Sequence, residues 1–265
     1  MKTRIISAIV ALAILVPIFL YGGMIFNITI YILGILALKE FLGVKNNKKE
    51  IPNFIKFISY ILLTIIMLLN TNKTDVFTMD YRLVAGLFIM FLIPTVLYHD
   101  RKKFSVNDAF YLIGGIFFIS ISMSLFILIR ETSLNILIYL FLISIMTDTF
   151  AYFTGILIGK HKLLEVISPK KTWEGMIGGT VFGTFIGVMF YVVVINPEVS
   201  LPLIIGTTLF LSIIGQFGDL IFSAIKRYFN TKDFSNLMPG HGGILDRFDS
   251  IIFIMLGFMF FINML

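Results

Sequence analysis

Residues 134–158 read LNILIYLFLISIMTDTFAYFTGILI, and this stretch contains a single charged side chain, Asp148. A helix needs about 20 mostly apolar residues to cross the hydrocarbon core of a bilayer. The stretch lacks the alternation of apolar and polar residues that a membrane β-barrel requires. Backbone groups in lipid must bond within their own segment, which leaves the helix. The stretch therefore predicts a membrane-spanning helix and decides the fold class.

The rest of the chain has the same character. It is 58% hydrophobic and 14% charged, with a mean hydropathy of +0.99, whereas water-soluble domains are about 45–50% apolar and about 25% charged. These values exclude an ordinary cytosolic globule, a disordered chain and a nucleic-acid-binding domain. We predict an all-α, polytopic integral membrane protein with about nine transmembrane helices. The nine apolar runs are Ile5–Tyr21, Met24–Leu38, Phe54–Leu69, Leu83–Tyr98, Phe110–Ile129, Leu134–Ile158, Met176–Ile195, Leu201–Phe222 and Ile251–Leu265.

The distribution of basic residues predicts the orientation. The net charge is +6, and with nine spans 18 of the 21 Lys and Arg residues fall on the side of the N-terminus. Positively charged loops stay in the cytoplasm, so we expect a cytoplasmic N-terminus and an outside C-terminus in the inner (cytoplasmic) membrane. The basic clusters at 45–49 and 101–103 are interpreted as topology signals alone. The first run follows a basic start but has no small-residue cleavage site, so we expect this helix to be retained.

The chain has no internal repeat and no low-complexity linker, which indicates one integral membrane unit. We expect about five spans in residues 1–130 and about four spans, with the catalytic site, in residues 131–265. The absence of cysteine excludes disulfides, thiolate metal sites and cysteine nucleophiles. Polar residues within the apolar runs gather in the second part.

Two of the later runs carry polar stripes. An ionisable residue at mid-bilayer costs about 2.5–3.5 kcal/mol, so Asp148 and Asp219 each need a partner, a water-filled cavity or a metal. Residues three or four apart share one helix face. One such face carries Ser144, Asp148, Tyr152, Gly155 and Gly159. Another carries Gln216, Asp219, Ser223 and Lys226. Interhelical hydrogen bonding is the alternative role, but an unpaired carboxylate is poorly suited to it.

The segment 231–249 combines glycines, acids and bases. The glycines of PGHGG at 239–243 allow close approach of the backbone to a ligand. Asp246 and Asp249 could only complement the dipole of the last helix, or they could join Asp219 in a site for a hard cation. Mg²⁺ takes oxygen ligands and usually bridges to substrate phosphate. Basic side chains around the acids suit phosphate: Lys226, Arg227, Lys232, His241 and Arg247. His241 could instead only hydrogen-bond within the loop.

The stretch SPKKTWEG at 168–175 leads into a predicted helix. Lys170, Lys171 and Thr172 near a helix N-terminus form a plausible anion cradle, with a solvated loop as the alternative. The chain lacks G-x-x-x-x-G-K-[ST], so this is not a P-loop.

These motifs resemble a known family. SAIKR at 223–227, KD at 232–233 and PGHGGILDRFD at 239–249 resemble the C-terminal hallmark of the CDP-diacylglycerol synthases, or phosphatidate cytidylyltransferases, of bacterial type. DTFAYFTG at 148–155, the stretch 168–175 and QFGDL at 216–220 also look like the family, so the resemblance covers roughly residues 144–255. It implies that CTP and phosphatidic acid give CDP-diacylglycerol and pyrophosphate at the cytoplasmic face, with one or two Mg²⁺ ions. It also implies a homodimer.

A hypothetical mechanism for this reaction gives roles to the candidate residues. We expect Asp219, Asp246 and Asp249 to hold Mg²⁺ against the CTP phosphates. Asp148 is expected to be a further ligand or a cytidine contact. Lys226, Arg227 and Arg247 are expected to bind the phosphate of the lipid or the pyrophosphate. Lys170, Lys171 and Thr172 are expected to bind the nucleotide phosphates. Ser223 and His241 are further expected substrate-binding residues.

Three alternatives stay open at this point. The first is a CTP-dependent lipid kinase or a cytidylyltransferase for another lipid phosphate. The second is a transporter, which would spread its acids across the bilayer depth and show inverted repeats. The third is a non-catalytic scaffold, which would leave the clustered acids and bases unexplained.

Overall fold

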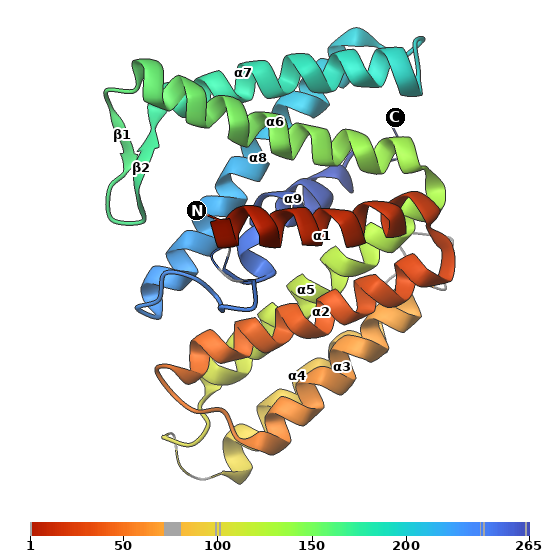
Figure 1. Cartoon of the computed structure of the whole chain (residues 1–265). Helices are drawn as coiled ribbons and strands as arrows, with labels where there is room; N and C mark the ends of the chain where they lie inside the picture. Colours follow the sequence, from red (N-terminus) through yellow and green to blue (C-terminus); the bar gives the residue numbers. More distant parts are fainter. Residues whose placement is uncertain are drawn as a thin grey trace. The chain divides into compact units, whose positions relative to one another are not determined.

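A computed structural model describes residues 2–71, 81–98, 100, 102–238, 240, 242–262 and 264–265, and the side chains of these except residues 2–8, 70 and 71. The predicted helical class is confirmed (Figure 1). The helices are α1 (Lys2–Tyr21), α2 (Gly23–Asn46), α3 (Asn53–Thr71), α4 (Tyr81–Leu97), α5 (Val106–Thr132), α6 (Leu134–Ile158), α7 (Trp173–Phe190), α8 (Leu201–Tyr228) and α9 (Leu245–Phe258). A π-helical turn, η1 (Tyr191–Ile195), continues α7.

Within the described residues, five helical segments are long and apolar enough to cross a membrane: α2, α5, α6, α7 with η1, and α8. The helices α1, α3 and α4 contribute shorter apolar stretches. Helix α6 has the bounds predicted from the sequence. Its N-cap is Ser133, whose side chain accepts a hydrogen bond from the Ile136 amide. A multi-pass membrane protein is thereby supported, while the count of nine spans stays a prediction.

The chain divides into two compact units. The first comprises Met1–Leu128 and Asp233–Asp246, and the second comprises Ile129–Lys232 and Arg247–Leu265. The segment 233–246 therefore packs with the early helices, whereas the sequence alone groups it with its neighbours along the chain.

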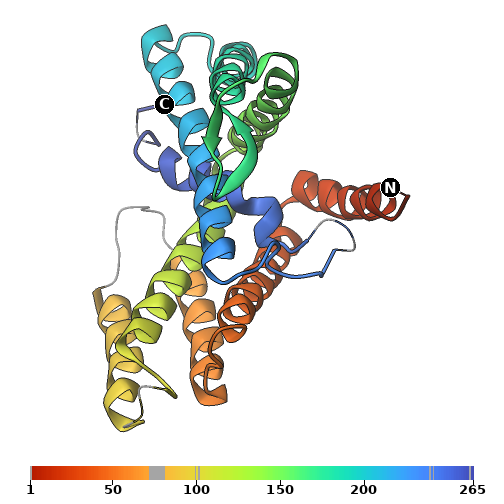
Figure 2. The same cartoon turned by 90° about the vertical axis from the view of Figure 1, so that its left-hand side faces the viewer.

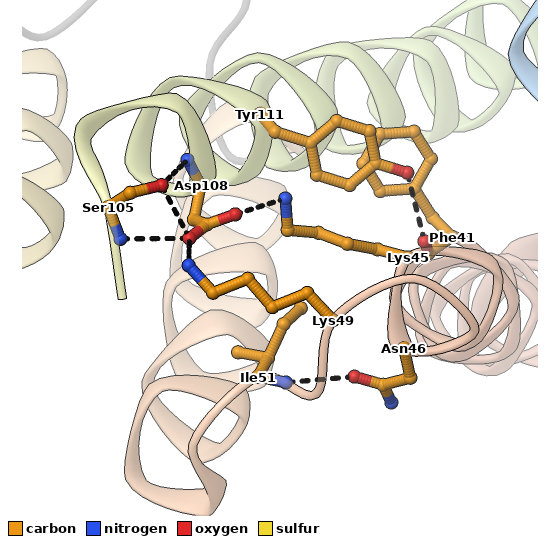
Figure 3. Close-up of polar contacts among 8 residues, drawn as sticks. All are labelled: Phe41, Lys45, Asn46, Lys49, Ile51, Ser105, Asp108 and Tyr111. Atoms are coloured by element: carbon orange, nitrogen blue, oxygen red, sulfur yellow. Dashed lines mark hydrogen bonds and ion pairs between the residues drawn. The ribbon is translucent and has the colours of Figure 1, made fainter. Parts of the chain in front are cut away.

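In the first unit, a buried ion cluster joins α2 to the start of α5 (Figure 3). The ammonium group of Lys45 lies 2.6 Å from Asp108 Oδ1, and Lys49 pairs with Oδ2 of the same carboxylate. The amide and hydroxyl of Ser105 donate to that Oδ2 over 2.8 and 2.7 Å. Lys45 also stands 4.6 Å from the ring centroid of Tyr111. The basic cluster at 45–49 is therefore more than a topology signal, because two of its lysines hold a buried carboxylate from another helix.

In the second unit, α6 and α7 lie side by side (Figures 1 and 2). The contact is made by small residues, since a Cβ added at Gly179 would lie 2.6 Å from the carbonyl oxygen of Thr147. Buried hydroxyl pairs connect α6 to α8: Tyr139 with Thr208 at 2.7 Å and Thr147 with Ser212 at 2.8 Å. Such close contacts are typical of helix packing in membranes.

Two short strands lie where the sequence analysis placed only a connection that leads into a predicted helix. Strands β1 (Lys162–Leu164) and β2 (Ser168–Thr172) form an antiparallel hairpin beyond the ends of α6 and α7 (Figure 2). The Trp173 amide closes its base by donating to the His161 carbonyl over 3.0 Å. The argument against strands applies to backbone crossing the bilayer, and a short hairpin in a connecting segment can satisfy its own hydrogen bonds.

Candidate active site

A cavity of about 510 Å³ lies in the second unit, with walls from α6, the hairpin, α7 and α8. It combines acidic, basic and apolar side chains. Its lining residues are Asp148, Ala151, Tyr152, Gly155, Ile156, Lys162, Leu163, Lys170, Lys171, Thr172, Gly175, Met176, Gln216, Asp219 and Leu220.

The two polar stripes predicted from helical spacing both reach this cavity. Asp148, Tyr152 and Gly155 contribute the α6 wall, and Gln216 and Asp219 contribute the α8 wall. The period of the helix therefore identified correctly which face of each run meets the other elements.

Neighbouring side chains hold these polar groups in place. The Gln216 side-chain amide donates to Thr180 Oγ1 over 2.8 Å, which ties α8 to α7. The Ser223 hydroxyl donates to Asp219 Oδ1 over 3.3 Å, so Ser223 acts on the site through Asp219. On the opposite wall, the Ser250 hydroxyl donates to Asp148 Oδ2 over 3.4 Å.

The predicted anion cradle lies on strand β2 at the same cavity. Lys171 Nζ lies 2.6 Å from Asp219 Oδ2, and both side chains are 28% exposed. The hydroxyl of Thr172 accepts the Gly175 amide over 3.1 Å, so it caps the N-terminus of α7. Lys170 lines the cavity beside them. These three residues line the same cavity as Asp148 and Asp219, and their contact with a nucleotide stays a prediction.

Three carboxylates of the second unit interact with one another. Asp148 and Asp249 each experience the charge of Asp219, and Asp249 also experiences that of Asp148. The positive charges of two ammonium groups oppose the repulsion between these carboxylates. Lys171 attracts Asp148, and the buried Lys226 attracts Asp249. The backbone of α9 comes close to α8, because a Cβ at Gly218 would lie 2.7 Å from the Asp249 carbonyl oxygen.

Asp246 belongs to the first unit and has a separate environment. Its Oδ2 accepts the amides of Phe234 over 2.8 Å and Gly243 over 2.9 Å. Gly240 and Gly242 have φ angles of 79° and 80°, a left-handed conformation that favours glycine. The backbone is therefore sharply turned at these two glycines. The structure does not describe Pro239 or His241, so the predicted contact of His241 with substrate stays a prediction.

The predicted metal ligands are not gathered into a finished coordination shell. Among the side chains that the structure describes, no three Asp, Glu or His residues lie close enough together to hold one metal ion. Asp219 and Asp249 share the acidic region of the second unit, and Asp246 is bonded within the glycine loop of the first.

Two predicted phosphate contacts are exposed. Arg227 donates to the Thr231 carbonyl over 2.9 Å, and Arg247 follows Asp246 in the first turn of α9. Neither is among the described residues that line the cavity.

Lys162 and Glu40 are among the residues that the sequence analysis did not single out. Lys162 lines the cavity from β1, and the missed hairpin explains why, because its position depends on strand pairing. Glu40 is a buried carboxylate of α2 that bonds the segment 233–246. The only sequence signal for Glu40 was its position just after the apolar run Met24–Leu38.

The fold and the site together define a helical membrane protein whose cavity brings carboxylate and ammonium groups into contact. This combination suits a phosphate-bearing ligand and a hard cation. The chain belongs to the cytidylyltransferase family, whose sequence model matches residues 2–265.

Relatives of the family are similar over nearly their whole length. The chain is 39% identical to the phosphatidate cytidylyltransferase of Staphylococcus haemolyticus over 256 residues and to that of Staphylococcus aureus over 262 residues. It is 35% identical to the phosphatidate cytidylyltransferase of Staphylococcus saprophyticus over 259 residues. Each alignment covers 96% of this chain and 96% of the relative. The family resemblance noted in the sequence motifs is thereby confirmed.

Proposed function

We propose that this protein transfers the cytidylyl group of CTP to phosphatidate, giving CDP-diacylglycerol and pyrophosphate for phospholipid synthesis. The observation that carries the proposal is the cavity, in which Asp148 and Asp219 face Lys162, Lys170 and Lys171 within a bundle of apolar helices. A membrane-embedded substrate with a phosphate headgroup and a water-soluble triphosphate can both meet such a site. Membership of the cytidylyltransferase family supports the same reaction.

The reaction forms one P–O bond and breaks another. An oxygen of the phosphatidate phosphate attacks the α-phosphorus of CTP, and the bond from that phosphorus to the bridging oxygen of the β-phosphate breaks. The attacking oxygen is already anionic, so the reaction needs little base catalysis. Its main barrier is the repulsion between two anionic substrates, and fixed cations lower that barrier. Lys170, Lys171 and Lys162 of the hairpin supply positive charge at the cavity.

The donor chemistry of the site fits a divalent cation. Asp219 and Asp249 offer hard oxygen ligands and interact electrostatically, and Lys171 shows that Asp219 accepts a cationic partner. The proposed Mg²⁺ ligands are Asp219, Asp246 and Asp249, for one or two ions, and Asp246 uses its Oδ2 for two backbone amides. When bound, Mg²⁺ would neutralise triphosphate charge and steady the leaving pyrophosphate.

The proposal includes the location of the reaction. CTP is cytoplasmic, and the hairpin that lines the cavity belongs to a basic connection between α6 and α7. Basic connections stay in the cytoplasm, so the site faces that side of the inner membrane. The homodimer implied by the family resemblance is part of the same proposal.

The test is a product assay with purified protein, phosphatidate, Mg²⁺ and CTP labelled at its α-phosphate. Cytidylyl transfer carries the label into lipid and releases unlabelled pyrophosphate, and EDTA abolishes it. A CTP-dependent lipid kinase would leave the label in water-soluble CDP, and that result would refute the proposal. Replacing phosphatidate by another lipid phosphate distinguishes the remaining alternative, which would show higher activity with that acceptor.

A further inference from the structure

Glu40 of α2 is a buried carboxylate with three hydrogen-bond donors from a distant part of the chain. Its side chain accepts the hydroxyl of Ser235 over 2.7 Å, the amide of Ile244 over 2.8 Å and the amide of Leu245 over 2.9 Å. Only 5% of Glu40 is exposed. All four residues belong to the first unit.

The two amides lie at the beginning of α9, which starts at Leu245. The first N–H groups of a helix have no partner within the helix, and a negative charge beside them is favoured by the helix dipole. A cap normally comes from the residue that precedes the helix. Here it comes from a carboxylate about 200 positions earlier in the chain. Glu40 is therefore a tertiary cap for α9.

The glycine at 243 makes this approach feasible. A Cβ at this position would lie 2.5 Å from both carboxylate oxygens of Glu40. Any larger side chain would displace either the carboxylate or the loop.

The same segment is bonded to a second carboxylate. The Gly243 amide donates to Asp246 Oδ2, and the amides of the next two residues donate to Glu40. Three consecutive amides are thus divided between a carboxylate of α2 and the candidate metal ligand. A movement of Glu40 would change the path of the backbone that bonds Asp246.

We propose that Glu40 is a positioning residue that, through Ser235, Ile244 and Leu245, fixes the start of α9 and thereby the place of the Asp246 carboxylate. The inference rests on the proposed function only where it takes Asp246 to be a ligand of Mg²⁺. Glu40 itself acts through the backbone of the loop.

The test compares Glu40→Gln with two other variants of the full chain in detergent micelles. Glu40→Gln keeps the size of the side chain but replaces one acceptor oxygen with a donor, and because the amides of Ile244 and Leu245 bond different oxygens of Glu40, one of them loses its present acceptor. Gly243→Ala disturbs the same contact from the loop side. Asp108→Asn is the matched control, because this buried carboxylate of the same unit bonds Lys45, Lys49 and Ser105.

We expect amide hydrogen exchange at residues 243–245 to rise about tenfold or more in Glu40→Gln and Gly243→Ala. The kcat for cytidylyl transfer should fall about tenfold or more in both variants. Asp108→Asn should lower the melting temperature while leaving exchange at 243–245 and kcat within about twofold of wild type. This contrast separates a positioning role from a general loss of stability.

Unchanged exchange at 243–245 in Glu40→Gln would overturn the cap. Faster exchange with unchanged kcat and unchanged KM for CTP would overturn the positioning role. Inactive wild-type protein would refute the proposed function instead, and the exchange measurement would still decide whether Glu40 caps α9.

Discussion

Lys171 and Asp219 form a partly exposed ion pair, 2.6 Å apart, on the wall of the cavity. Exposed ion pairs contribute about 0–1 kcal/mol to stability, so this pair contributes little to folding. Its position beside Asp148 gives it another use, because an incoming phosphate can exchange with Asp219 for the ammonium group. At the residue scale, we propose that the pair is part of the substrate site.

We expect Lys171→Met to lower kcat/KM for CTP by about tenfold to a hundredfold, because the variant loses a fixed positive charge beside the triphosphate. The melting temperature should change little. Lys102→Met is the control, since Lys102 is an exposed lysine in a connection of the first unit. Equal activities of the two variants in the labelled-CTP assay would exclude Lys171 from the substrate site.

Asp246→Asn should abolish cytidylyl transfer while leaving expression and membrane insertion near normal. The asparagine keeps a carbonyl oxygen that can accept the amides of Phe234 and Gly243, so the loop retains its bonds but loses the charge that a hard cation needs. Glu198→Gln removes an exposed acid elsewhere and should remain active. Activity of Asp246→Asn within a few-fold of wild type would remove Asp246 from the proposed metal site.

At the scale of elements, the physical requirements of the bilayer made the helices predictable. Helix α6 has the predicted bounds because its length and composition match the hydrocarbon core. Helix α2 extends beyond its apolar run to Asn46, because Glu40 and Lys45 are buried against partners that are distant in sequence. Local pattern carries no information about such partners.

In the candidate site, the residues on helix faces were predictable, and those placed by strand pairing or tertiary contact were not. Helical spacing placed Asp148 and Asp219 on inward faces, and both line the cavity. The hairpin was missed because a strand of three residues has too few positions to show a pattern. Lys162 was missed with it. The pairing of Glu40 with α9 depends on tertiary contact and leaves no periodic signal.

The α6–α7 contact yields a prediction about stability. Gly179→Ala should lower the free energy of unfolding by about 1–3 kcal/mol, because the added methyl group would overpack against the backbone of Thr147. Thermal unfolding in detergent micelles measures the effect. Gly206→Ala in α8 is the matched control, since a Cβ there meets nothing within 4 Å. It should be neutral or slightly stabilising, as alanine favours helix over glycine. Equal melting temperatures for the two variants would contradict the packing argument.

At the scale of the whole molecule, the predicted side of the C-terminus depends on whether α9 crosses the membrane. Helix α9 has 14 residues, which gives a length of about 21 Å against a hydrocarbon thickness of about 30 Å. Residues 259–262 and 264 lie in turns. The Tyr191 hydroxyl donates to the carbonyl oxygen of Leu265 over 3.1 Å, and Tyr191 lies in η1, at the end of α7 away from the hairpin. This bond supports an end of the chain on the side opposite the hairpin.

Because the chain contains no cysteine, single substitutions can report this topology by labelling with a membrane-impermeant maleimide in intact cells. We expect Glu198→Cys and Met264→Cys to be labelled from outside, since both sites are exposed and the second neighbours η1 through Leu265. Lys48→Cys, in the basic connection after α2, should react only after permeabilisation. Labelling of Glu198→Cys with protection of Met264→Cys until permeabilisation would mean that α9 does not cross. The chain would then have an even number of spans, and the C-terminus would be cytoplasmic.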